Sequence, residues 1–321
     1  MKNLTRKVAG LPVALLPTMV GAITLSNVYY SVFSFAWIMH LTTIAAMVIW
    51  LLAVVKIIIH FDIFLGEYKN PVLASLYAAV TMLLMLFGAY LHPFFPEFGK
   101  GLWLAAILLH SVQILIFTYR HLIKSRSWDT FVPTWLVAYL GILVSVAVGG
   151  RMDELLLNRM IFYYGLVTCC VLVVFLIYRL STRPLAPIFL HSKCIFLAPP
   201  SLCLVGYLTV MEYINPLVAY LLYAIVLLMF LYFLKNLPAF FSVPFAPGFA
   251  GLTFPNAIGI VASLQMSWYL ESVGNVVLSQ IVREIAGIQI YITTAVIAFV
   301  LYKFIKMFAD SCAHKEKIEK N

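Results

Sequence analysis

The chain has 321 residues, of which 64% are apolar and only 10% are charged, and its mean hydropathy is +1.03. A soluble domain carries about a quarter of its residues as charged side chains. Uncharged runs of about 18 residues or more recur along the chain, which is the length a helix needs to cross a bilayer core of roughly 30 Å. This composition excludes a soluble globular protein and predicts a polytopic membrane protein.

Apolar runs bounded by charged residues or proline predict an all-α protein with ten transmembrane helices, paired as five hairpins in a single domain covering residues 1–321. Helices are expected because backbone groups in lipid must find their hydrogen bonds within the segment. The predicted spans lie near residues 10–29, 33–58, 71–91, 101–120, 132–149, 157–178, 189–210, 216–234, 245–268 and 285–307. A short N-terminal segment precedes them, and residues 310–321 are predicted to be a disordered polar tail.

The net charge of +9 is distributed unevenly between the two sides of the predicted membrane domain. If both termini lie on one side, 17 of the 21 lysines and arginines fall on that side. Basic residues concentrate in cytoplasmic loops, so this bias predicts cytoplasmic termini. We expect an integral protein of a bacterial inner membrane, and the basic excess reflects topology and does not predict a nucleic-acid partner.

Proline and glycine fall mainly inside the odd-numbered spans. Proline within a helix removes a backbone hydrogen bond and bends the helix, which a membrane tolerates where the freed carbonyls face protein or water. The odd spans are therefore predicted to form a bent inner set, and the even spans a straighter outer set that faces lipid. The predicted kinks lie at Pro17, Pro199, Pro200, Pro247, Pro255 and Gly141.

The polar side chains of the odd spans are mostly hydroxyls. Six that we predict as lining residues are Thr18, Ser75, Thr81, Thr134, Ser201 and Thr253, and further hydroxyls are Thr24, Ser145 and Ser263. Hydroxyl groups can solvate an anion without fixing it, as conduction requires. They also serve cations, and they commonly bond to carbonyls of their own helix. Both interpretations stay open at this point.

Ionisable side chains are scarce at membrane depth. His110, midway along the fourth span, is the deep candidate for a protonation switch, and a hydrogen-bonded packing residue is the alternative. His92 and Glu97 have the spacing of some acyltransferase motifs, but they lie in a proline-containing external loop. The sequence has no HExxH, P-loop or GxGxxG motif. It therefore predicts no enzyme, no cofactor and no metal site.

Two stretches resemble a known family. EYKNPV, residues 67–72, leads directly into the third span and resembles the corresponding entry in the tellurite-resistance and C4-dicarboxylate transporter family. That family includes the bacterial TehA proteins and the slow anion channel of plant guard cells. GLTFPNAIGIVAS, residues 251–263, contains a Phe254-Pro255 pair that is similar to the aromatic–proline pair of the family.

The resemblance implies ten helices with quasi-fivefold symmetry, in which the five inner helices line a central pore, and it implies a homotrimer. It further implies that Phe254 projects into the pore and gates it. The chain departs from the family at AAVTMLL, residues 78–84, where Thr81 stands in the place of a proline. The bend of the third span is therefore open, and Gly88 is a second candidate for it.

The sequence favours an anion channel or channel-like transporter that moves small inorganic or organic anions, with Phe254 as a steric plug. The alternative is a secondary transporter that moves C4-dicarboxylates, tellurite or related oxyanions together with protons, for which His110 would supply the switch. A third hypothesis is a membrane sensor or scaffold that transports nothing. Reversal potentials discriminate between the first two, because only a symporter responds to pH.

Overall fold

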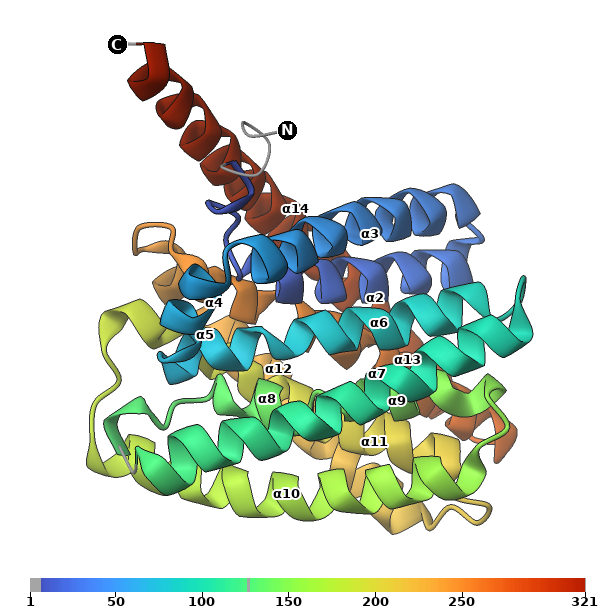
Figure 1. Cartoon of the computed structure of the whole chain (residues 1–321). Coiled ribbons are helices and arrows are strands. Elements are labelled where there is room, and N and C mark those ends of the chain that lie inside the picture. Colours follow the sequence, from blue (N-terminus) through green and yellow to red (C-terminus); the bar gives the residue numbers. More distant parts are fainter. Residues whose placement is uncertain (1–6, 126–127, 321) are drawn as a thin grey trace.

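The computed structural model describes residues 7–125 and 128–320, and every regular element within these ranges is a helix. The longer helices run side by side as a bundle (Figure 1). Eight helical stretches in the described ranges are long and apolar enough to cross a membrane. The all-α prediction is confirmed. The count of ten spans and the fivefold arrangement stay predictions.

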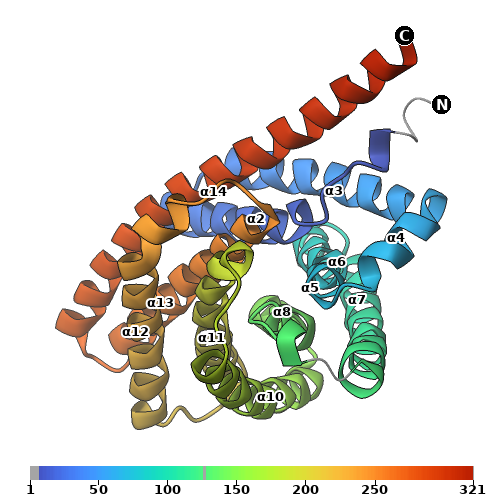
Figure 2. The same cartoon turned by 90° about the vertical axis from the view of Figure 1, so that its left-hand side faces the viewer.

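Five long helices form the outside of the bundle (Figure 2). They are α3 (Ala36–Ile59), α7 (Pro96–Phe117), α10 (Leu155–Thr182), α12 (Pro216–Phe241) and α14 (Val276–Lys320). Only 22–39% of the most apolar window of each stretch is buried by the rest of the protein. Helices that are apolar all round and largely exposed are typical of surfaces that face lipid.

Five further segments lie inside this outer set, nearer the centre of Figure 2. They are α2 (Leu15–Phe33), α5 with α6 (Pro71–Leu76, Ala78–Leu91), α8 with α9 (Trp135–Leu140, Leu143–Val148), η4 with α11 (Pro187–Leu197, Ala198–Val210) and η5 with α13 (Pro247–Leu252, Phe254–Ser272). Among these, the third, seventh and ninth predicted spans are 72–83% buried in their apolar windows. The predicted division into inner odd and outer even spans agrees with this burial.

The prolines of the inner segments stand at helix starts, and in the seventh and ninth spans Pro199, Pro200 and Pro255 lie where a 3₁₀ turn changes to an α-helix within the span. Their role as kinks stays a prediction. Pro17 is the third residue of α2, Pro199 and Pro200 follow Ala198 at the start of α11, and Pro255 is the second residue of α13. The first-turn N–H groups of a helix have no partner within it, so a proline costs little there. The preceding turns of the seventh and ninth spans are 3₁₀ helices.

The third span is broken without a proline. Its two helices, α5 and α6, meet at Tyr77, whose carbonyl accepts a hydrogen bond from the Val80 N–H. Gly88 does not mark this break. A Cβ there would lie 2.8 Å from the Gly99 carbonyl oxygen, so Gly88 permits close packing of α6 against α7. The open question about the bend is therefore answered by a break at Tyr77.

Two outer boundaries differ from the predictions. The eighth span was predicted to end near 234, but α12 continues to Phe241 and includes Pro238. The tail predicted to be disordered from Asp310 continues α14 as a helix up to Lys320. Lysine, glutamate and alanine dominate that tail and are good helix formers, so a helix already nucleated upstream can continue through it. Residues 1–6 and 321, at the predicted cytoplasmic termini, lie outside the described residues.

The remaining elements connect the long helices. They are α4 (Phe61–Tyr68), the π-helical turn η1 (Thr118–Lys124), and the 3₁₀ turns η2 (Trp128–Thr130) and η3 (Gly149–Arg151). The motif EYKNPV occupies the connection between α4 and α5. Its Asn70 caps α5, because the side-chain oxygen accepts a hydrogen bond from the Val72 N–H at 2.9 Å, and Pro71 is the first residue of that helix.

Candidate central conduit

A small cavity of about 40 Å³ lies at the centre of the bundle, and all five inner segments contribute to its wall. Pro17 comes from α2, Leu76 from α5, Leu140 from α8, Pro199 from α11 and Phe254 from α13. The side chains that line this central cavity are apolar throughout. Segments far apart in the sequence therefore converge on one uncharged space.

Phe254 is the first residue of α13 and lines two cavities at once. One is the central cavity. The other, the outer cavity, has a volume of about 230 Å³ and is lined from α2, α6, α9 and α13. The phenyl ring is 8% exposed, so it is nearly enclosed but still borders open space. Phe254 lies at the boundary between the two cavities.

The outer cavity adjoins a larger vestibule of about 560 Å³, and the two share lining residues. The shared residues are Asn27, Leu86, Ala147 and Val148. The vestibule is also lined by Arg151, which places a cation at its wall.

The three spaces all border α2. Pro17 lines the central cavity, whereas the outer cavity (Thr24 to Ser31) and the vestibule (Ile23 to Tyr30) lie beside one later stretch of the helix. The 13 steps from Pro17 to Tyr30 correspond to roughly 20 Å along a helix axis at 1.5 Å per residue. The spaces together therefore extend along about two thirds of a bilayer core, with Phe254 between the central and the outer cavity.

Gly21 sets how closely α2 approaches Phe254. A Cβ at Gly21 would lie 2.6 Å from the Phe254 nitrogen and 2.9 Å from the Thr253 Cβ, both shorter than real Cβ contacts. The Thr253 hydroxyl donates to the Ala250 carbonyl at 2.7 Å, which fixes the turn that precedes α13. Thus the start of α13 is held against α2 by a glycine that no other residue replaces without displacement.

His110 joins an outer helix to two inner segments and does not line any of the three spaces. Its Nε2 donates to the Ala138 carbonyl at 3.2 Å, so its Nδ1 accepts from the Thr81 hydroxyl at 2.6 Å. The imidazole is fully buried, and its Cε1 would lie 2.8 Å from a Cβ at Gly141. This placement matches the packing alternative, because both nitrogens are engaged within the protein.

The six hydroxyls predicted to line a passage are not among the residues that line the central cavity, the outer cavity or the vestibule. Four donate to carbonyls of their own segment: Thr18 to Ala14, Ser75 to Val72, Ser201 to Leu197 and Thr253 to Ala250, whereas the Thr81 hydroxyl donates to His110 Nδ1. Thr134 is buried without a partner. Local bonding to the backbone keeps most of these hydroxyls away from the three spaces, and their lining role stays a prediction.

The polar lining lies instead on one face of α2. Thr24, Asn27 and Ser31 all line the outer cavity. Their spacing of three and four residues places them on the same side of a helix. This periodicity was present in the sequence and could have identified the face, although it does not indicate what the face contacts.

Two of the predicted kink residues lie away from the centre. Pro200 lines a groove between α10, α11 and α12, on the opposite side of α11 from Pro199. Pro247 is exposed at the start of η5. Gly141, by contrast, separates α8 from α9 and lines the central cavity.

A buried ion pair supports the break of the third span. The Lys56 ammonium group lies 2.8 Å from the Glu67 carboxylate and donates to the Leu11 carbonyl at 2.9 Å. The Tyr77 hydroxyl donates to the same carboxylate. Lys56 is 3% exposed. These contacts connect α3 and α4 to the turn before α2 and to the break between α5 and α6, which explains why Glu67 stands in the motif.

The fold and the site define a helical membrane protein in which broken inner segments surround an apolar centre. The chain belongs to the SLAC1 family of voltage-dependent anion channels, whose family model matches residues 10–307. A search of curated proteins found no match to the chain. The resemblance inferred from the two motifs is confirmed, and the protein is an integral membrane protein of a family of anion channels and transporters.

Proposed function

We propose that this protein conducts small anions through the central cavity, the outer cavity and the vestibule, and that Phe254 is the gate between the first two. The observation that carries the proposal is the position of Phe254 in the walls of both cavities. A space of about 40 Å³ holds only a few water molecules. An apolar constriction of this size excludes a hydrated ion by volume and by dewetting, so the structure corresponds to a closed state.

The polar groups along the route favour anions. Whereas the Thr24 and Ser31 hydroxyls donate to the Val20 and Val28 carbonyls of their own helix, Asn27 offers amide donors to the outer cavity, and Arg151 places a positive charge at the vestibule. Donors of this kind solvate an anion while binding it weakly enough for release. Carboxylates, which would attract cations, are not among the lining residues of the three spaces.

The test is the anion current of Phe254→Ala in planar bilayers with purified protein. Removing the ring opens the constriction without adding a binding group, so we expect current per protein to rise about tenfold or more, equal to a barrier lower by roughly 1.4 kcal/mol. Phe254→Leu keeps part of the volume and should give an intermediate current. Phe98→Ala is the control, because Phe98 is 63% exposed and lines none of the three spaces. An unchanged current in folded Phe254→Ala would contradict the gating proposal.

Proton-coupled transport of dicarboxylates, tellurite or related oxyanions would need a titratable group on the route. His110 lies off the route with both nitrogens bonded. His40 lines the vestibule, where its Nδ1 bonds to the Tyr90 hydroxyl, but the constriction at the central cavity has no titratable lining residue. We therefore propose that anions pass through the protein as through a channel, and that the protein transports and does not catalyse. Reversal potentials should follow the anion gradient alone. A shift with a pH gradient would support coupling, and no flux under any gradient would support a sensor or scaffold.

The arrangement of the chain in the membrane is also part of the proposal. The convergence of five inner segments on one cavity supports a ten-span protomer with quasi-fivefold symmetry. The excess of lysine and arginine supports termini in the cytoplasm of a bacterial cell. Family resemblance supports a homotrimer. Accessibility of single cysteines at Lys124 and Arg151 tests the orientation, because the two positions should be labelled from opposite sides.

A further inference from the structure

A second, lateral groove of about 390 Å³ lies near the ends of α7 and α10, apart from the central conduit. Four elements contribute to its walls. His121 comes from η1, Trp128 and Trp135 come from η2 and α8, and Val171 and Phe175 come from α10. Aromatic side chains dominate this lateral groove, and it is enclosed between helices that are themselves largely exposed.

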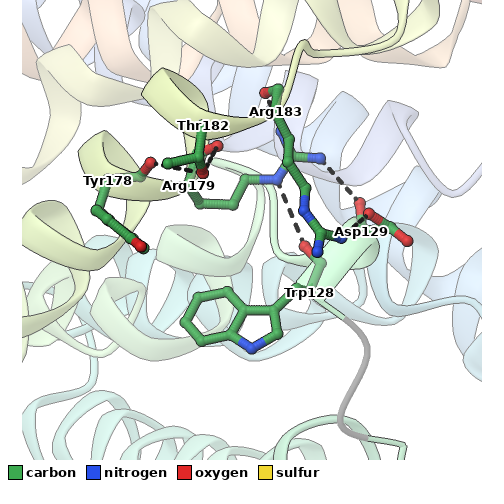
Figure 3. Close-up of polar contacts among 6 residues, drawn as sticks. All are labelled: Trp128, Asp129, Tyr178, Arg179, Thr182 and Arg183. Carbon is green, nitrogen blue, oxygen red and sulfur yellow. Dashed lines mark hydrogen bonds and ion pairs between the residues drawn. The ribbon is translucent and has the colours of Figure 1, made fainter.

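The rim of the lateral groove is fixed by a buried cation (Figure 3). The Arg179 guanidinium, 5% exposed, donates to the carbonyl oxygens of Trp128 at 3.4 Å, Asp129 at 3.3 Å and Arg183 at 3.0 Å. Arg183 forms an ion pair with the Asp129 carboxylate at 2.6 Å. These contacts hold η2 against the end of α10. The Trp128 ring packs edge-on against Phe131.

His121 offers a polar group inside the groove that nothing in the described chain satisfies. Its side chain is 4% exposed, and its Nε2 is buried without a hydrogen-bond partner. It lies in the π-helical turn η1, and π-helical turns are rare and occur frequently at functional sites. Buried polar atoms are ordinarily satisfied, so the unpartnered nitrogen marks a polar position directly behind the groove wall.

The basic residues at the mouth of the lateral groove favour an anionic ligand. Lys124 ends η1, and Arg179 and Arg183 lie at the end of α10, against the single carboxylate of Asp129. Basic pockets between membrane helices bind anionic lipid headgroups, and basic residues near the surface attract the anionic cytoplasmic leaflet. An aromatic groove joined to a basic mouth is complementary to an acyl chain joined to a phosphate.

We propose that the lateral groove binds one anionic phospholipid, with an acyl chain along Trp128, Trp135 and Phe175 and the phosphate near Lys124 and Arg183. The bound lipid touches α8, a helix of six residues that separates the groove from the central cavity. Trp135 and Tyr139 face the groove, whereas Leu136, Val137 and Leu140 line the central cavity.

The first experiment measures lipid retention by native mass spectrometry on the purified full chain, titrated with phosphatidylglycerol or phosphatidylcholine. We expect a tight phosphatidylglycerol adduct that phosphatidylcholine does not reproduce. Val171→Trp fills the groove and should abolish this adduct. Val174→Trp is the matched control, since Val174 lies on the same helix and lines a different groove, so it should bind as wild type does. Equal binding of the two lipids, or retention of the adduct in Val171→Trp, would overturn the proposal.

The second experiment separates the headgroup from the chain. Lys124→Gln and Arg183→Gln should each weaken phosphatidylglycerol binding about fivefold, as expected for one basic residue near the membrane surface. Free glycerol phosphate, which lacks the acyl chains, should not compete. Competition by glycerol phosphate, or charge variants that bind as wild type does, would contradict the assignment. A change of oligomeric state in Val171→Trp but not Val174→Trp would show that another copy of the chain covers the groove. Both experiments are independent of conduction.

Discussion

The inner and outer segments of this bundle are similarly apolar, but they differ in whether their helices are continuous. The outer helices are unbroken through their apolar windows, and at most 39% of any window is buried. The third, fifth, seventh and ninth spans are interrupted at Tyr77, Gly141, Ala198 and Phe254. Lipid cannot satisfy a free backbone carbonyl, whereas neighbouring protein can. Interruptions are therefore confined to the segments that other segments cover.

The proline inside α12 is consistent with this rule. Pro238 lies in the last turn of the helix, which ends at Phe241, beyond the predicted limit of the span at 234. A carbonyl freed near a helix end is close to water or the interfacial region. The inner and outer segments thus differ in where their backbone groups can find hydrogen-bond partners. Their apolar content is secondary.

Lys56 departs from the pattern, because it lies on the outer helix α3 and yet is 3% exposed. Lys56→Met should give the largest loss of stability, about 3–4 kcal/mol, since it leaves the Glu67 carboxylate, which is 26% exposed, without its cation. The measurement is the thermal unfolding midpoint of purified protein in detergent. Arg283→Gln is the control: its partner is Glu271 at 2.5 Å and both side chains are more than half exposed, so its loss should cost less than about 1 kcal/mol. Equal effects of the two variants would contradict the role given to Lys56.

Two leucines compare the inner and outer surfaces directly. Leu83→Ala in α6 should cost about 3 kcal/mol, because Leu83 is 0% exposed and its removal leaves a cavity in the protein. Leu108→Ala in α7 should have almost no effect, because Leu108 is 66% exposed and lipid or detergent fills the vacated space. Unfolding midpoints of both variants in the same detergent make the comparison. A larger loss for Leu108→Ala would reverse the assignment of the two helices.

Two glycine-to-alanine variants test the comparison of inner and outer helices with the addition of a single methyl group. Gly21→Ala should destabilise the protein by about 1–3 kcal/mol, because the added carbon meets the backbone of Phe254 and Thr253. Gly101→Ala in α7 meets no atom within 4 Å and should be neutral or slightly stabilising. Since the clash also displaces Phe254, basal anion current should change in Gly21→Ala and stay at the wild-type level in Gly101→Ala. Identical unfolding midpoints for both would show that α2 can move away from α13 at no cost.

Much of the fold could be predicted from the chain itself. Runs of apolar residues correspond to helices at every predicted range, and proline placement separated the buried segments from the exposed ones. The motifs around Glu67 and Phe254 were sufficient to indicate the family. These features depend on length, hydropathy and local backbone chemistry, which are properties of contiguous residues.

The lining of the conduit could not be predicted in the same way. Thr18 and Ser201 bond to carbonyls four residues earlier, while Asn27 on the same helix as Thr18 faces open space. That choice depends on which distant segment covers each face. His110 similarly links α7 to α6 and α8 through hydrogen bonds, and it does so only because Thr81 and Ala138 lie beside it.

The sequence by itself determined the class of protein, its helical segments, its family and the division into inner and outer sets. The tertiary structure alone decided where the inner segments break, which side chains meet at the central cavity, and that Gly21 lies against Phe254. The physical reason is that hydropathy acts on each segment separately. A cavity and a close contact, by contrast, arise between residues that only packing brings together.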